Sequence, residues 1–211
     1  MNKLYTRRPC GRKNRLKSMK HLKIATTNES IHLEGSTIFI AGAYGTGKST
    51  ICSSLTETLH IPSFSAGDLI SSVNGEKYGA NKTVSDKNAN QQLLSECVRQ
   101  LILKNKIIIL AGHFCIFDAN NGIDILPESV YSTLYISRII LLEADVQSII
   151  ANLYRRDGKN YSWGSISTLI KKEREQSKRI AEQLNCPLNI YHMTFTDQDL
   201  NNIASLIREG N

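Results

Sequence analysis

The sequence contains no apolar segment long enough to cross a membrane. Its 211 residues are 41% apolar, yet every apolar run stops well short of the ~20 residues that a membrane-spanning helix requires. No apolar stretch follows directly on the basic N-terminus, which argues against a secretory signal peptide. The length suits one globular domain, and we expect it to act in the cytoplasm without a membrane partner.

The sequence also lacks closely spaced cysteines. Its five cysteines, Cys10, Cys52, Cys97, Cys115 and Cys186, lie far apart and form no C-x-x-C motif. An odd number at such spacing favours neither a disulfide framework nor a zinc site. We therefore expect reduced thiols, as in the cytoplasm.

Acidic residues are absent from the first 23 positions, which hold nine Lys or Arg residues. The net charge of +7 arises in this segment, because the remainder from Ile24 carries about −2 by side-chain count. We predict a basic, disordered tail over residues 1–23. It either makes weak contacts with the phosphates of nucleic acid, stays a solvated extension, or is mostly missing from the native protein because translation begins at Met19. Tyr5 is its only Phe, Trp or Tyr residue, which argues against base stacking.

From Ser36 onward, apolar runs alternate with segments of helical periodicity. This alternation predicts an α/β fold with a mostly parallel sheet and helices on both faces. Residues 75–86 are polar and predict a mobile loop, and residues 112–127 predict a long loop. Buried strands are expected at 36–41, 106–111, 137–145 and 187–192, a short strand within 61–68, and helices at 48–59, 88–104, 145–154, 166–184 and 197–208.

The segment "GAYGTGKST", residues 42–50, matches the phosphate-binding pattern G-x-x-x-x-G-K-[ST]. Gly42, Gly45 and Gly47 allow the backbone N–H groups to converge on phosphates, and the helix that follows adds its N-terminal dipole. Lys48 is suited to reach the outer phosphates, and the Ser49 hydroxyl to bind Mg²⁺. The motif predicts a P-loop NTPase fold with ATP as co-substrate and Mg²⁺ as cofactor. The predicted nucleotide-binding residues are Gly42, Gly45, Thr46, Gly47, Lys48, Ser49 and Thr50.

Two motifs of GTPases are missing after this loop. There is no N-K-x-D segment to recognise guanine, and no D-x-x-G segment at the end of an expected strand. These absences argue against a GTPase.

The segment "FSAGDLI", residues 64–70, resembles the S-x-G-D-[LM] segment of nucleoside monophosphate kinases. From Ile38 to about Ile190, the chain is similar to archaeal-type adenylate kinases and their nuclear relatives. The similarity is strongest at the P-loop, and weaker at Ser65–Leu69 and at His113–Asp145 with its "LLEAD" segment. The resemblance implies that Ser65, Gly67, Asp68 and His113 bind the phosphate acceptor. Asp68 would also approach Mg²⁺ through water, or cap a helix that starts at Leu69, or both. His113 either binds the acceptor or packs its loop.

The same resemblance implies a short, arginine-rich lid. Arg155 and Arg156 end one expected helix, with Lys159 close by and Gly158 and Gly164 as hinges. Arginine suits this role because phosphoryl transfer depends on positioning and on neutralising negative charge. We expect Lys48, Asp68, Arg155 and Arg156 to be the catalytic residues. Arg174 and Arg179, on the next helix, either face the phosphates or, like any helix arginine, lie in solvent.

Two departures from the family pattern bear on function. Ala111 stands where the family has a carboxylate at the end of the central strand, so either Asp68 or Asp118 replaces it or metal binding is weaker. No Arg follows "GDL" directly, and Arg99 or Lys87 would have to serve instead.

Three functions remain open, with residues 24–211 as a P-loop kinase-like domain. The first is an adenylate-kinase-like phosphotransferase that moves the γ-phosphoryl group of ATP to a nucleoside monophosphate or a related small acceptor. The second is a non-catalytic or weakly hydrolysing ATP-binding regulator. The third is an RNA- or ribosome-associated ATPase with the basic tail as anchor.

Overall fold

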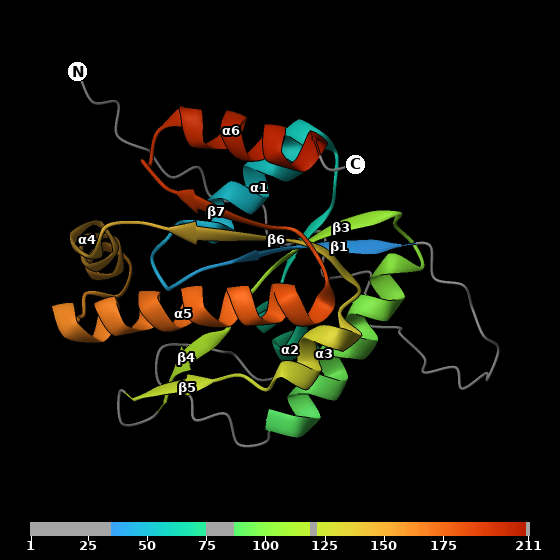
Figure 1. Ribbon diagram of the computed structural model, residues 1–211, viewed down its shortest axis with the longest axis horizontal. Helices are drawn as coiled ribbons and strands as arrows, with labels where there is room; N and C mark the ends of the chain where they lie inside the picture. Colours follow the sequence, from blue (N-terminus) through green and yellow to red (C-terminus); the bar gives the residue numbers. More distant parts are fainter. Residues whose placement is uncertain (1–34, 75–86, 119–121, 210–211) are drawn as a thin grey trace. The chain divides into compact units, whose positions relative to one another are not determined.

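The computed structural model describes residues 35–74, 87–118 and 122–209 (Figure 1). The predicted tail over 1–23 and the predicted mobile loop over 75–86 lie outside the described residues. Within the described part, no helix is long and apolar enough to pass through a bilayer. Cys52, Cys97, Cys115 and Cys186 are free thiols there.

A five-stranded sheet forms the centre, in the order β2-β3-β1-β6-β7, and every neighbouring pair is parallel. Continuous apolar runs make up its three middle strands, as expected for strands that are covered on both faces. Ile38, Phe39 and Ile40 of the middle strand are all buried. The strands are β1 (Ser36–Ala41), β2 (Ser63–Ser65), β3 (Ile107–Ala111), β6 (Ile136–Glu143) and β7 (Leu188–His192).

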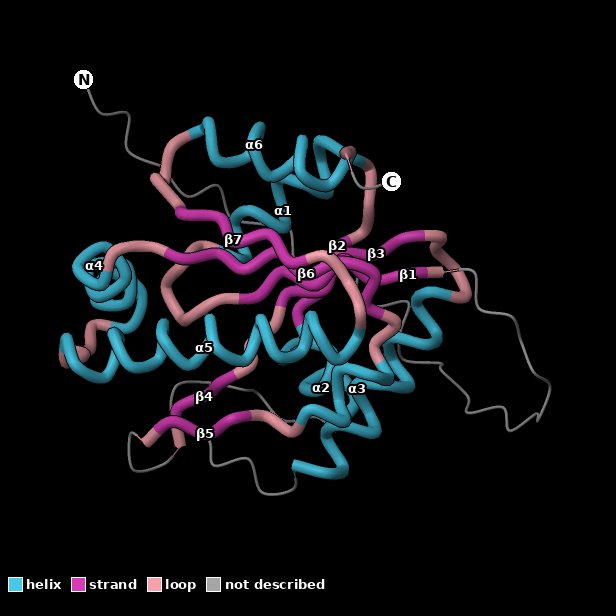
Figure 2. The backbone as a smooth tube through the Cα atoms, viewed as in Figure 1, coloured by secondary structure: helices cyan, strands magenta, loops and turns pink. Residues whose placement is uncertain are grey.

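Helices cover both faces of this sheet, as predicted (Figures 1 and 2). The helices α1 (Lys48–Leu59) and α6 (Asp197–Arg208) lie together on one face. The opposite face carries α5 (Trp163–Leu184), with α2 (Ala66–Asn74) and α3 (Lys87–Ile102) beside it. The helix α4 (Val146–Asp157) follows β6 directly.

The long loop expected at 112–127 is partly wrong, because the segment contains a β-hairpin. Strand β4 (Cys115–Phe117) pairs antiparallel with β5 (Ile123–Ile125). The Asp118 carboxylate accepts a hydrogen bond from the Gly122 N–H at 2.7 Å and closes the hairpin. A 3₁₀ helix, η2 (Glu128–Thr133), follows. Three-residue strands are too short for alternation of apolar residues to mark them.

Two expected helix boundaries move toward the N-terminus. Helix α2 begins at Ala66 rather than Leu69, so Asp68 lies in its first turn and is not its N-cap. The Ser65 Oγ accepts a hydrogen bond from the Asp68 N–H at 3.3 Å instead. Helix α5 begins at Trp163, which places Gly164, predicted as a hinge, in the first turn of the helix rather than in the loop before it.

Candidate functional site

The phosphate-binding loop joins β1 to α1 and bends sharply. Gly42, Gly45 and Gly47 have φ angles of 144°, 82° and 85°, a region that L-residues with a side chain rarely adopt. A Cβ atom at Gly42 would collide with the Leu142 carbonyl oxygen of the neighbouring β6. The loop therefore lies directly against the sheet, and these positions require glycine for conformation and for space.

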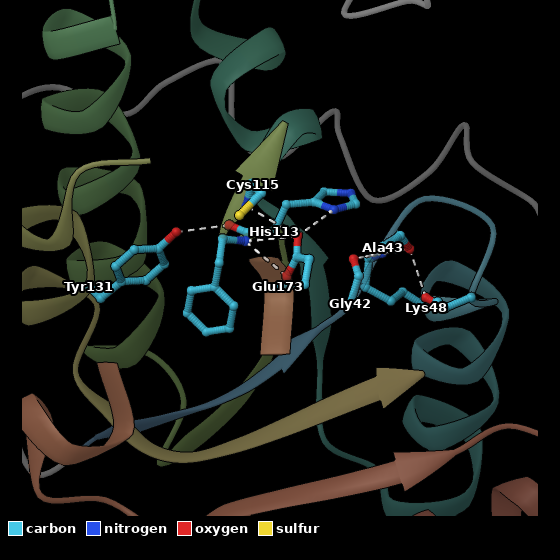
Figure 3. Close-up of polar contacts among 9 residues, drawn as sticks. Gly42, Ala43, Lys48, His113, Cys115, Tyr131 and Glu173 are labelled. Carbon is cyan, nitrogen blue, oxygen red and sulfur yellow. Dashed lines mark hydrogen bonds and ion pairs between the residues drawn. The ribbon is translucent and has the colours of Figure 1, made fainter. Parts of the chain in front are cut away.

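Lys48 is buried inside this loop, with only 8% of its surface exposed. Its Nζ donates hydrogen bonds to the carbonyl oxygens of Gly42, at 2.7 Å, and Ala43, at 2.8 Å (Figure 3). Burial lowers the pKa of Lys48 to about 8, while the negative charge of Glu173 acts in the opposite direction. A solvent-facing Lys48, as expected for a residue that reaches the phosphates, is therefore not found, because the ammonium group is folded back onto the loop. Its contact with phosphates stays a prediction.

The remaining loop hydroxyls divide into two kinds. Ser49 and Thr50, in the first turn of α1, are exposed and free to meet a nucleotide. Thr46 is buried, and its hydroxyl donates to the Ala43 carbonyl oxygen at 2.9 Å. The Thr46 side chain thus holds the loop in shape.

Helix α4 supports the loop from one side. The Asn152 side-chain amide donates to the Gly45 carbonyl oxygen at 2.9 Å, a contact that no sequence motif indicated. Arg155 is directed toward the same residue, since its guanidinium donates to Asn152 Oδ1 at 2.5 Å. Arg156 pairs with Asp157 at 2.5 Å, and its positive charge acts on both Lys48 and Tyr44. Arg155 is thus connected to the loop through Asn152, whereas Arg156 acts on it through its charge.

The arginines of α5 do not face the phosphate loop. Arg174 forms an ion pair with Glu143 at the end of β6. Arg179 pairs with Glu128 of η2 at 2.7 Å. Arg174 and Arg179 thus bind carboxylates of the protein on partly exposed side chains, and their predicted contact with phosphates stays a prediction.

The predicted acceptor residues gather at the carboxyl ends of β2 and β3. Ser65 pairs with Ala111 in the sheet register, and a methyl group at Gly112 would lie 3.8 Å from the Ala66 Cβ. Asp68, in the first turn of α2, is exposed. Since β3 lies beside β1, this group is adjacent to the phosphate loop at the same edge of the sheet. Ligands of open α/β sheets bind at this edge, where the connections of neighbouring strands diverge.

His113 contacts the phosphate loop directly. Its ring lies 4.2 Å from the ring of Tyr44, centroid to centroid. Its Nδ1 lies 3.4 Å from Oε1 of Glu173, a residue of α5 that the sequence analysis did not single out. Burial lowers the pKa of His113, the positive charge of Lys48 lowers it further, and Glu173 opposes both effects.

An aromatic column continues from His113 toward the predicted lid. Tyr44 stacks on Phe117 of β4 at 5.7 Å, and Phe117 stacks on Tyr161 at 6.1 Å. Burial, and secondarily the charge of Glu173, raise the pKa of Tyr44 to about 12. The column connects the phosphate loop to the segment that follows Arg156.

Oxygen atoms suited to Mg²⁺ are present on both sides of the loop. Mg²⁺ takes oxygen ligands and keeps several waters, so an exposed hydroxyl and an exposed carboxylate beside substrate phosphates are sufficient. Ser49 and Asp68, both exposed, are the residues predicted to supply these groups. The described residues include no cluster of three or more His, Cys, Asp or Glu that would hold a metal without a nucleotide.

The connection between β7 and α6 also lies against the phosphate loop. A methyl group at Gly47 would lie 3.7 Å from both Met193 Cε and a ring carbon of Phe195. Phe195 has a φ of 58°, an uncommon angle for an aromatic residue. No sequence pattern marks these residues, which are adjacent to the loop only through the fold.

A phosphate-binding loop between the middle strand of a parallel sheet and the helix after it defines a P-loop α/β protein. A family model described as an AAA domain matches residues 41–169, more than half of the chain. The chain therefore belongs to this AAA domain family. No curated protein matches it.

Solved structures of small-molecule kinases are similar to it. A shikimate kinase from Bacteroides thetaiotaomicron has a TM-score of 0.54 and 15% identity over 82% of this chain and 96% of that chain. A shikimate kinase from Acinetobacter baumannii has a TM-score of 0.49 and 13% identity over 83% and 92%. A gluconokinase from Sinorhizobium meliloti 1021 has a TM-score of 0.48 and 10% identity over 84% and 97%. The first likeness confirms the predicted fold class, a P-loop fold of the kinase-like kind.

Proposed function

We propose that this protein is an ATP-dependent kinase that transfers the γ-phosphoryl group to a small acceptor. The observation that carries the proposal is the contact between Tyr44 and His113, which joins the phosphate loop to the predicted acceptor residues. Phosphoryl transfer requires two ligands held in line and little covalent chemistry from the protein. The similarity of the fold to a shikimate kinase supports this choice of reaction class.

Three of the four predicted catalytic residues, Lys48, Asp68 and Arg156, have a distinct task in this proposal. Lys48 exchanges the carbonyl oxygens of Gly42 and Ala43 for the outer phosphates of ATP. Ser49 and Asp68 would hold Mg²⁺, which would supply positive charge against the phosphates of ATP. Arg156 meets the charge that develops on the moving phosphoryl group. Phe195, beside Gly47, would contact the nucleotide base.

The proposed acceptor is a nucleoside monophosphate. The support is the S-x-G-D-L pattern at Ser65–Leu69, whose Ser65 caps α2 at the carboxyl end of β2. The described residues of this region offer hydrogen-bonding groups, from Ser65, Asp68 and His113, beside the phosphate loop. The free thiols of the described cysteines support the cytoplasm as the compartment.

A second candidate is an ATP-binding regulator with little or no transfer activity, for which the basic tail would provide contact with RNA. Two observations favour it. Strand β3 ends in Ala111, without a carboxylate. Arg155, Arg174 and Arg179 are directed toward side chains of the protein itself.

One screen separates the two candidates. The purified full chain is mixed with MgATP and each ribo- and deoxyribonucleoside monophosphate in turn, with shikimate and gluconate as non-nucleotide acceptors, and ADP release is measured. We expect one or a few monophosphates to accelerate ADP release, and Lys48→Ala to abolish the acceleration. Tight ATP binding without stimulation by any acceptor would favour the regulator.

A further inference from the structure

Glu173 is a buried carboxylate in the middle of α5, with 1% of its surface exposed. Its Oε1 accepts hydrogen bonds from the backbone N–H groups of Phe114 and Cys115, both at 3.1 Å (Figure 3). These residues follow β3 directly, at the edge of the sheet where the candidate site lies. A buried carboxylate is costly unless such partners compensate it, so its presence here requires an explanation.

The same carboxylate faces the ring of His113. The Nδ1 atom of His113 is buried and lies 3.4 Å from Glu173 Oε1, at ion-pairing distance. The backbone of Gly42 is the other hydrogen-bonding group that acts on this ring. The carbonyl oxygen of His113 accepts a hydrogen bond from the Tyr131 hydroxyl at 2.9 Å, which fixes the backbone from the other side. With Nδ1 turned toward Glu173, Nε2 lies on the far side of the ring (Figure 3).

We propose that Glu173 is a positioning residue for His113. Its carboxylate holds the Nδ1 proton and orients the ring, so that Nε2 is presented as the hydrogen-bonding atom toward the acceptor. A carboxylate that binds one imidazole nitrogen sets the tautomer and leaves the other nitrogen for ligand or proton, as in other His–carboxylate pairs. The acceptor contact of Nε2 rests on the proposed function, whereas the orientation of the ring does not.

The placement also addresses the missing acid at Ala111. Among the described residues, Glu173 is the carboxylate whose charge acts on Lys48, His113 and Tyr44 together. Glu173 of α5 therefore supplies negative charge near the phosphate loop, whereas β3 ends in the uncharged Ala111. Among the described residues, the ionisable groups on which the charge of Glu173 acts are Tyr44 of the loop, Lys48 of α1, His113, Cys115 of β4 and Tyr131 of η2.

Nuclear magnetic resonance of ¹⁵N-histidine-labelled protein tests this orientation without measuring turnover. The His113 signals are assigned by their loss in His113→Asn. In the wild-type chain we expect neutral His113 to carry its proton on Nδ1. In Glu173→Gln we expect the His113 pKa to fall, because the negative charge that favours the imidazolium is removed. Glu175→Gln is the matched control, since Glu175 lies on the same helix with its side chain 57% exposed.

A wild-type His113 with its proton on Nε2 would overturn the proposal, as would a titration in Glu173→Gln that shifts no more than in Glu175→Gln. If Glu173→Gln does not fold, the wild-type tautomer alone decides. If the acceptor screen succeeds, kcat should fall roughly tenfold or more in Glu173→Gln, with KM for ATP nearly unchanged and Glu175→Gln unaffected. Failure of the screen removes the proposed function and leaves the tautomer result intact.

Discussion

Lys48 is a basic side chain in a buried position, where its charged form is disfavoured. Burial lowers the pKa of Lys48 to about 8, so near pH 8 the group is only partly protonated when no nucleotide is bound. Phosphate oxygens favour the ammonium form and raise the pKa again. ATP binding should therefore take up on the order of half a proton at pH 8 and almost none at pH 6, where Lys48 is already charged.

Calorimetry in buffers of different ionisation enthalpy measures this uptake. In Lys48→Ala the uptake should disappear along with most of the affinity. In Lys171→Ala, where the side chain is 77% exposed, it should persist. Equal proton uptake at pH 6 and pH 8 in the wild-type chain would contradict the assignment to Lys48.

Replacing glycine by alanine should have opposite effects on stability at two positions of this chain. Gly42 has a φ of 144°, and a Cβ there would meet the Leu142 carbonyl oxygen and, at 3.1 Å, the Thr46 hydroxyl. Gly42→Ala should lower the free energy of unfolding by about 2 kcal/mol or more. Gly164 lies in α5 with nothing within 4 Å of a built Cβ, so Gly164→Ala should raise it by about 0.5–1 kcal/mol. Urea denaturation followed by circular dichroism compares the variants, and a loss of stability in Gly164→Ala would count against the helix found there.

At the level of residues, the sequence motif predicted the phosphate loop, which is one short segment. It did not predict contacts between residues that are far apart in the sequence. The phosphate loop followed from nine consecutive residues, because its function depends on local glycines and one Lys. Glu173 lies about sixty positions from Phe114, and Asn152 more than a hundred from Gly45, so no local pattern connects them. The direction of Lys48 was wrong for a related reason: the carbonyl oxygens that bind it become available only when the loop folds.

At the scale of elements, α4 links the phosphate loop to the predicted lid. Its C-terminal turn carries both lid arginines, and Gly158, with a φ of 67°, ends it. Arg155 donates back to Asn152, whereas the charge of Arg156 acts on Lys48. Arg156→Ala should therefore lower kcat by roughly a hundredfold, because a preorganised guanidinium is lost from the transition state.

ATP affinity without acceptor should change much less in Arg156→Ala, since Lys48 and the loop N–H groups hold the ground state. Arg155→Ala is the internal comparison and should lose less activity than Arg156→Ala. Steady-state kinetics with ATP titration gives both quantities. A larger loss of kcat in Arg155→Ala would mean that the helix turns its other arginine toward the phosphates in the closed complex.

Element type was predictable wherever an element was long and periodic. Helix α6 runs over Asp197–Arg208 and α1 over Lys48–Leu59, as expected from their apolar spacing. The β4–β5 hairpin was missed, because its strands hold three residues each and are stabilised by the Asp118 turn and by packing on α5. Polar partners of long side chains, such as Glu143 for Arg174, depend on how elements pack, which periodicity does not report.

At the scale of the whole molecule, the excess positive charge is concentrated at the N-terminal end of the sequence. Residues 1–18 hold seven of the nine basic residues of the tail, and their removal takes the net charge from +7 to about zero. The P-loop, the predicted acceptor residues and α4 all lie within the unit that starts at Leu33. A chain lacking residues 1–18 should therefore keep its ATP affinity and any acceptor-stimulated turnover.

RNA binding should respond in the opposite way. Each phosphate contact that a Lys or Arg makes adds to the salt dependence of binding, by about 0.7 in the slope of log K against log salt for single strands. The shortened chain should bind a single-stranded RNA more weakly and with a smaller slope in a fluorescence anisotropy titration at several salt concentrations. A full-length variant with the seven basic residues changed to Gln separates charge from length, and should match the shortened chain. If the shortened chain binds RNA as tightly and with the same slope, the contact lies elsewhere, on a body whose own net charge is about −2 from Ile24 onward.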